Sequence, residues 1–297
     1  MDGLAGRELG SVVVGTNFSD GARAALERAG WLPLGRGAMV EIVHALPDEH
    51  DRGVAEQMDA AAYEHLNEAR RSFTIASPVN AVAKRDVFIS AKHGRPDIEI
   101  ARGAHRGRAE LIVLGRHDHQ TVRDLLVGST AERVARRGDV SVLVVKRSPA
   151  GPYRRPCVAV DLSESSRLAI EMALRLSERT AESIDIVYAL PLIDTVDLPV
   201  PGYRIAEDVR RARAQLSEFL RDFERSSVRF DIAIHAGDPR AIILQEARHR
   251  GADLIALGTH GRSGVARAVM GSVAERVLRA ATCDVLIARL PRADVRL

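Results

Sequence analysis

The sequence is poor in aromatic residues, which make up 4% of its 297 positions, and it contains two cysteines, Cys157 and Cys283. With so few rings, the hydrophobic cores must be built from Val, Ile, Leu and Ala. Two cysteines this far apart form no disulfide framework, and a reducing compartment is the simpler interpretation. The formal net charge of +3 is small, so bulk electrostatics indicates neither a nucleic-acid nor a membrane-surface partner.

Long apolar runs are also missing. The longest, such as Ser11–Val14 and Leu111–Leu114, have the length of a strand and are far too short to cross a bilayer. Residues Met1–Gly10 mix acidic and basic side chains without the apolar segment of a secretory signal. We therefore expect a cytoplasmic protein.

What the sequence does contain is an internal repeat. The segment from Gly94 to Gly115 returns 143 positions later, from Gly237 to Gly258, and Gly128-Ser129 returns at the same distance as Gly271-Ser272. A repeat of this length is a whole domain. Residues 1–147 and 156–297 are therefore predicted to be two domains of one kind, joined by a proline-containing linker within residues 146–156.

Each copy alternates strands with helices. In the second copy, the predicted strands are Val158–Val160, Ile184–Tyr188, Val228–His235, Leu254–Leu257 and Val285–Ala288. The predicted helices include Ala169–Leu176, Asp208–Arg225, Pro239–Arg250 and Ser272–Ala281. This alternation predicts an α/β fold, in which each copy is a doubly wound, five-stranded parallel sheet. In the strand order 3-2-1-4-5, strands one and four flank the switch point where such sheets bind ligands.

A glycine-rich segment follows the fourth strand of the second copy. It reads Gly258-Thr259-His260-Gly261, then nine residues, then Gly271-Ser272. Glycine after a strand allows a sharp turn and close approach of a ligand. A helix beginning at Gly271-Ser272 offers N–H groups and a positive dipole end to an anion. The spacing suits a phosphate cradle, but Ser272 with Glu275, like Ser129 with Glu132, is also a helix-capping box.

The chain resembles the universal stress protein family in its tandem two-domain form. The resemblance is carried by these motifs, by the Ala-Glu-Arg-Val that follows them, and by the segments Val160–Ser163 and Cys283–Ile287. The resemblance covers almost the whole chain. It implies the Rossmann-like, adenine nucleotide α-hydrolase-like fold and an ATP site. It also implies that the domains pair through their last strands, here Val140–Val145 and Val285–Ala288 within one chain.

The resemblance implies the roles of individual residues in the second copy. It implies that Asp161, at the end of the first strand, binds the ribose and that Ala189 lines the adenine pocket. The phosphate-binding positions are Leu257, Gly258, Gly261, Gly271, Ser272 and Val273. His260 and Arg262 lie in the same loop and are candidate phosphate contacts. From the residues alone, Asp161 is also explained as a turn or helix-cap aspartate before Ser163.

The first copy departs from this pattern at two positions. Asn17 stands where the ribose aspartate is expected, and Asp118 replaces the second loop glycine. The remaining equivalents are Ala45, Gly115, Gly128 and Ser129. An amide bonds a hydroxyl more weakly than a carboxylate does, and Asp118 would repel a triphosphate by about 1 kcal/mol or more. We expect one ATP site, with or without Mg²⁺, in the second copy, and a first copy that binds nucleotide weakly, binds something else or is a scaffold.

Other groups of residues indicate less. His117-Asp118-His119 is a local trio, whereas metal sites draw ligands from several elements, so no metal site is predicted. Arg210, Arg211 and Arg213 are expected on a solvated helix face. The sequence has no P-loop lysine motif and no serine nucleophile elbow, and no catalytic residue is assigned. Cys283 is expected to be buried and structural.

Three hypotheses stay open. The first and favoured one is an ATP-binding regulator of a cytoplasmic stress response, where the word stress comes from the resemblance. The second is an enzyme of a related fold, a slow ATPase or a nucleotidyl-transfer enzyme. The third is an interaction scaffold without nucleotide. The sequence identifies no protein partner, and a homodimer remains an alternative to domain pairing within one chain alone.

Overall fold

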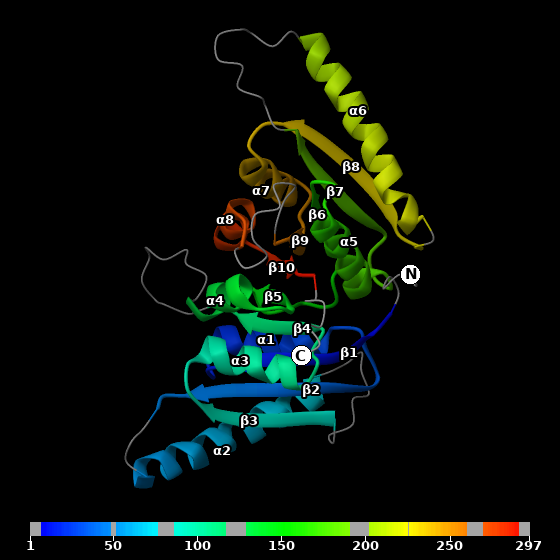
Figure 1. Cartoon of the computed structure of the whole chain (residues 1–297). Coiled ribbons are helices and arrows are strands. Elements are labelled where there is room, and N and C mark those ends of the chain that lie inside the picture. The colour runs from blue at the N-terminus through cyan, green and yellow to red at the C-terminus, as the bar shows by residue number, and fades with distance from the viewer. Residues whose placement is uncertain are drawn as a thin grey trace, which may run out of the picture.

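The computed structural model describes residues 7–48, 52–76, 86–116, 129–190, 202–224, 226–259 and 270–290. Its strands form one ten-stranded sheet with the order β3-β2-β1-β4-β5-β10-β9-β6-β7-β8 (Figure 1). Neighbouring strands within each half are parallel, and each half has the predicted order 3-2-1-4-5. The two halves meet at the antiparallel pair β5–β10.

The elements follow one another in the same order in both halves. The first half contains β1 (Leu9–Thr16), α1 (Asp20–Gly30), β2 (Leu34–Leu46), α2 (Arg52–Ala76), β3 (Val87–His93), α3 (Pro96–Arg106), β4 (Leu111–Gly115), α4 (Ser129–Arg137) and β5 (Ser141–Val145). The second half contains β6 (Pro156–Val160), α5 (Glu164–Ser177), β7 (Ser183–Leu190), α6 (Gly202–Leu220), a short 3-10 helix (Arg221–Phe223), β8 (Arg229–Ala236), α7 (Pro239–His249), β9 (Leu254–Gly258), α8 (Ser272–Ala280) and β10 (Asp284–Ala288). Every strand and helix predicted for the second half is present, although α6 begins at Gly202 rather than Asp208.

Two layers of helices cover the two faces of the sheet. Helices α1, α2, α5 and α6 pack on one face, and α3, α4, α7 and α8 pack on the other. The long helices α2 and α6 lie at opposite ends of the molecule (Figure 1). Because successive strand residues point to opposite faces, Val12 and Val14 belong to the first core and Val13 to the second. None of the helices in the described ranges is long and apolar enough to cross a lipid bilayer.

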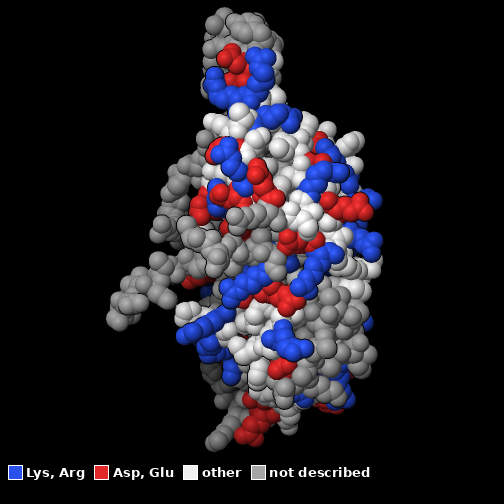
Figure 2. Space-filling model, turned by 90° about the vertical axis from the view of Figure 1, so that its right-hand side faces the viewer, with Lys and Arg blue, Asp and Glu red and all other residues white. Residues whose placement is uncertain are grey.

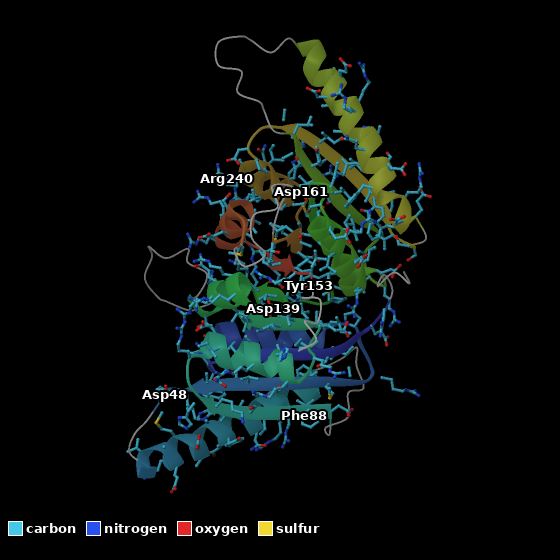
Figure 3. The ribbon with its side chains drawn as sticks, viewed as in Figure 1. Asp48, Phe88, Asp139, Tyr153, Asp161 and Arg240 are labelled. Carbon is cyan, nitrogen blue, oxygen red and sulfur yellow. The ribbon has the colours of Figure 1, made fainter. Side chains whose placement is uncertain are left out.

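The residues between β5 and β6 form neither helix nor strand, but they are held by hydrogen bonds to both halves. Tyr153 is buried between the two halves (Figure 3), and its hydroxyl donates to Oδ2 of Asp284 at 2.7 Å. The hydroxyl of Thr180 donates to the backbone oxygen of Tyr153 at 2.5 Å. The connection therefore fixes the halves relative to one another instead of acting as a loose tether.

The contacts between the halves recur as equivalent pairs. Nζ of Lys146 donates to the backbone oxygen of Leu278 at 2.6 Å, and Nη2 of Arg289, 143 positions after Lys146, donates to that of Ala135 at 2.9 Å. The ion pairs between α4 and α8 repeat in the same way: Arg136 with Glu275, and Arg279 with Glu132. The two copies are thus related by a pseudo-twofold axis through β5–β10. The pairing of last strands within one chain, which the resemblance implied, is confirmed.

Candidate nucleotide-binding site

The winding of the sheet reverses between β1 and β4 in the first half and between β6 and β9 in the second. In β6–β9 the paired register ends at Val158 and Ala256, two residues before either strand ends. Beyond that point the strands separate at their carboxyl ends. This is the position at which doubly wound sheets bind ligands.

In the first half this position is a cavity of about 240 Å³. Its lining includes three residues that the sequence places at the equivalent site, Asn17, Ala45 and Gly115. The structure therefore brings these three together. Ser129 begins α4, while Asp118 and Gly128 lie outside the described residues.

In the second half the candidate residues come from four elements. Asp161 directly follows β6 (Figure 3), and Ala189 lies near the end of β7. Leu257 and Gly258 end β9, and Gly271, Ser272 and Val273 lie at the start of α8. All of these positions are at the carboxyl edge of the second sheet half, and Asp161, Ala189, Leu257, Gly258 and Val273 are equivalents of residues that line the first-half cavity. His260, Gly261 and Arg262 lie outside the described residues.

Asp161 forms a local turn before α5. Its Oδ1 accepts a hydrogen bond from the backbone N–H of Ser163 at 3.1 Å, and Leu162 between them has φ of 66°. Asn17 forms the same turn in the first half, where its Oδ1 accepts from the N–H of Ser19 at 3.2 Å. Asp161 therefore adopts the geometry of a turn aspartate before Ser163, one of the two explanations that the sequence offered. However, an amide oxygen serves the turn as well, so folding does not require the negative charge at position 161.

Gly258 owes its lack of a side chain to packing. A Cβ at this position would lie 2.5 Å from Cβ of Ser165 and 2.8 Å from its carbonyl carbon, because the start of α5 crosses directly over the end of β9. Gly115 is in the same situation, since its Cβ would lie 1.9 Å from the backbone oxygen of Gly21. Close approach of a helix therefore explains both glycines, which the sequence interpretation assigned to a ligand.

Helix α8 begins differently from the capping-box prediction. Its N-cap is Gly271, whose N–H donates to the backbone oxygen of Thr259 at 2.8 Å, and Ser272 is the first helical residue. Among the described residues, no side chain caps this helix. Glu275 instead forms ion pairs with Arg136 and Arg279. The prediction that Ser272 caps the helix is therefore wrong. Apart from that of Gly271, the N–H groups of the first turn have no side-chain cap, and the helix dipole favours an anion beside them.

The two cysteine thiols are buried and unreactive. Burial raises the pKa of the Cys283 thiol to about 12 and raises that of Cys157 as well, so both stay protonated. The expected burial of Cys283 is confirmed. Among the described residues no cluster of three metal-ligating side chains occurs, and His117-Asp118-His119 is outside them. Arg210, Arg211 and Arg213 are exposed, as predicted. Acidic and basic side chains intermingle on the face in Figure 2.

Arg116 and Thr130 are among the lining residues of the first-half cavity that were not singled out from the sequence. Arg116 directly follows β4 and is exposed, and Thr130 lies in the first turn of α4. In the sequence, only their positions next to Gly115 and Ser129 could have indicated that they line the site. Their equivalents in the second half are Thr259 and Val273, so the two crevices differ in charge as well as at Asn17.

Comparisons with known proteins agree with this architecture. The model of the universal stress protein family matches residues 9–146 and again residues 152–289. A universal stress protein of Methanocaldococcus jannaschii is 28% identical over 147 residues, covering 48% of this chain and 85% of the relative. One of Mycobacterium tuberculosis is 28% identical over 187 residues, covering 61% of this chain and 62% of the relative.

A solved structure shares the whole arrangement. The crystal structure of a universal stress protein from Archaeoglobus fulgidus is 19% identical and has a TM-score of 0.70, covering 94% of this chain and 98% of the other. At this identity the similarity concerns the fold. Two family matches, which together span nearly all of the described sheet, decide the classification. The chain belongs to the universal stress protein family, with two family domains in tandem.

Proposed function

We propose that this chain is a nucleotide-binding regulator of a cytoplasmic stress response, and that it holds ATP mainly in the crevice between β6 and β9. The observation that carries the proposal is the comparison of Asp161 with Asn17. Both side chains make the same turn before a helix, with oxygen-to-nitrogen distances of 3.1 and 3.2 Å. The second half therefore has a carboxylate at this position whose charge can bind a ligand, whereas the first half has a neutral amide.

The surroundings of Asp161 suit the parts of an adenine nucleotide. A half-buried carboxylate at the end of β6 accepts hydrogen bonds from ribose hydroxyls, and charged acceptors form the stronger bonds. The uncapped first turn of α8, at Ser272 and Val273, offers N–H groups to phosphate oxygens. Ala189 leaves room for the base beside β7. In this arrangement Mg²⁺ is held mainly by the phosphates and water, as is usual for this ion.

Calorimetric titration with ATP tests the proposal through one substitution. Asp161→Asn copies the first half, keeps the turn and removes the charge. We expect it to weaken ATP binding about tenfold or more, in line with the loss of one charge-assisted hydrogen bond. Asn17→Ala in the first half is the matched control and leaves the affinity unchanged. Equal affinities of the wild type and Asp161→Asn would refute the role of Asp161.

A further inference from the structure

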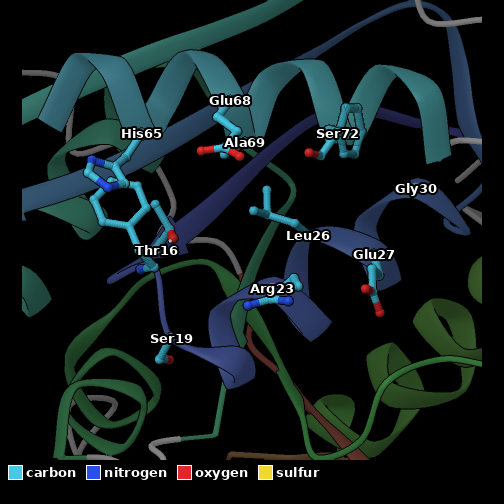
Figure 4. A pocket seen from close by; sticks show the side chains of 12 residues that line it. Thr16, Ser19, Arg23, Leu26, Glu27, Gly30, His65, Glu68, Ala69 and Ser72 are labelled. Atoms are coloured by element: carbon cyan, nitrogen blue, oxygen red, sulfur yellow. Dashed lines mark hydrogen bonds between the residues drawn. The ribbon is translucent and has the colours of Figure 1, made fainter. Parts of the chain in front are cut away.

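A second and larger cavity lies on the other side of the first half. It has a volume of about 460 Å³, within the range of small-molecule sites, and opens between α1 and α2 (Figure 4). Leu26 of α1 and Phe73 of α2 supply apolar surface, Phe18 and His65 supply rings 5.1 Å apart, and Arg23 stands at its margin. The two first-half cavities share Thr16 and helix α1, but α2 lines only this one, and α3 and α4 line only the one at the carboxyl edge of the sheet.

The second half shows which side chains fill the equivalent space. There Phe219 packs under the guanidinium of Arg167, with 4.6 Å between the Cζ atom and the ring centroid. The same guanidinium forms an ion pair with Asp222 at 2.5 Å. Phe219 and Asp222 are the nearest partners of Arg167, while Phe223 at 5.7 Å and Glu164 at 3.8 Å lie farther away. This contact leaves the Arg167 side chain 25% exposed.

The first half retains the arginine and the counterparts of Glu164 and Phe223, Asp20 and Phe73, but lacks the two nearest partners, Phe219 and Asp222. Burial aligns α2 with α6: Ala62, Leu66 and Phe73 are buried where Ala212, Leu216 and Phe223 are buried. In this alignment Phe219 corresponds to Ala69 and Asp222 to Ser72.

Likewise Arg167 corresponds to Arg23, which follows the N-cap Ser19 as Arg167 follows Ser163. Arg23 pairs only with the neighbouring Asp20 in the described contacts, and its side chain is 69% exposed. An exposed pair of this kind contributes little, so Arg23 can exchange it for a ligand at small cost.

The cavity also has more room than one phenyl ring requires. Gly30, which lines it, stands where the second half has the fully buried Leu174. Acidic neighbours do not distinguish the copies, because Glu27 and Glu68 have the counterparts Glu171 and Glu218. The second half accommodates a carboxylate, that of Asp222, beside these same two acids.

We propose that the first half binds a small aromatic carboxylate of one or two rings in this cavity. The rings lie between α1 and α2, where Phe219 lies in the other copy, and the carboxylate faces the guanidinium of Arg23. Phe18 and His65 extend the aromatic contact on the side of β1. The proposal is independent of nucleotide binding in the second half, since none of the lining residues belongs to that half.

Direct titration of the full chain with 2-naphthylacetate, followed by calorimetry and by the fluorescence of the naphthyl group, tests this. We expect one site per chain with a dissociation constant below 1 mM, and at least tenfold weaker binding of the uncharged 2-(2-naphthyl)ethanol. Saturation with ATP leaves the affinity unchanged. Absence of binding, equal affinity for the alcohol, or displacement of the probe by ATP would each overturn the proposal.

Two variants locate the site. Ala69→Phe with Ser72→Asp copies the second half, fills the cavity, and is expected to reduce affinity at least tenfold while leaving the denaturation midpoint the same or higher. Arg23→Gln, at an exposed position that does not threaten folding, removes the preference for the carboxylate over the alcohol. Unchanged affinity in the filled variant, or unchanged preference in Arg23→Gln, contradicts the assignment.

Discussion

Nε of Arg28 lies 3.0 Å from Oδ2 of Asp284, and these two buried side chains join the first helix of the chain to its last strand. Asp284 also accepts hydrogen bonds from the hydroxyl of Tyr153 and the backbone N–H of Lys146. Burial raises the pKa of Asp284, while the neighbouring Arg28 lowers it. One carboxylate therefore connects three separate segments at the junction of the halves.

Removal of Arg28 alone is predicted to be costly. Arg28→Met, which introduces the residue found at the equivalent position 172, leaves the buried carboxylate without its counter-ion and is expected to cost about 3–5 kcal/mol of unfolding free energy. Asp284→Ser introduces the residue of the equivalent position 141. The double variant is expected to lose at least about 0.5 kcal/mol less than the two single losses added together. Urea denaturation of the four proteins measures this, and strict additivity would contradict a direct coupling.

The lowered pKa of Lys146 predicts that the free energy of unfolding depends on pH. Burial and, secondarily, Arg116 lower the pKa of Lys146 to about 8, whereas a lysine in an unfolded chain titrates near about 10.4. Between these values the unfolded state binds more protons than the folded state, so this group makes stability rise with pH from about 8 to about 10.

Lys146→Arg provides the control, because Arg289 occupies the equivalent position and stays charged throughout this range. We expect the unfolding free energy of the wild type to increase relative to that of Lys146→Arg as the pH rises from about 8 to about 10. Denaturation series at several pH values measure the difference between the two proteins. A difference that is constant over the range would show that Lys146 titrates normally.

The fold could be predicted because its signals are local or repetitive. The apolar run Leu254–Leu257, the proline at the start of α7 and the repeat at 143 positions each specify an element or the whole domain plan. The pair Arg28 and Asp284 has no such signal, since its members lie 256 positions apart and neither side chain is unusual in its own segment. Long-range packing of this kind is visible only in the folded chain.

The candidate site likewise has features that the sequence predicts and features that only the folded chain reveals. The position of Asp161 after β6 follows from the strand pattern and was predicted. The reason for Gly258 was not, because it depends on how closely Ser165 of α5 approaches the strand. The cavity between α1 and α2 also escaped prediction, since it arises from a missing ring at Ala69 that only a structural alignment of the two copies reveals.

Gly258 supplies a prediction about stability rather than binding. In Gly258→Ala the new methyl group overlaps Ser165, and we expect a loss of about 1–3 kcal/mol in unfolding free energy. Gly35→Ala is the matched control, because its Cβ would meet only ordinary contacts of 3.4 Å or more. Thermal and urea denaturation compare the two. Equal stability of both variants would mean that α5 yields easily at this contact.

The most direct test of the proposed function is the number of ATP molecules bound per chain. Calorimetric titration of the wild type is predicted to give one, and the variant Asn17→Asp with Asp118→Gly, which restores the family pattern in the first half, is predicted to give two. A wild-type chain that binds no ATP, or one that already binds two with equal affinity, would contradict the account of one nucleotide site in the second half.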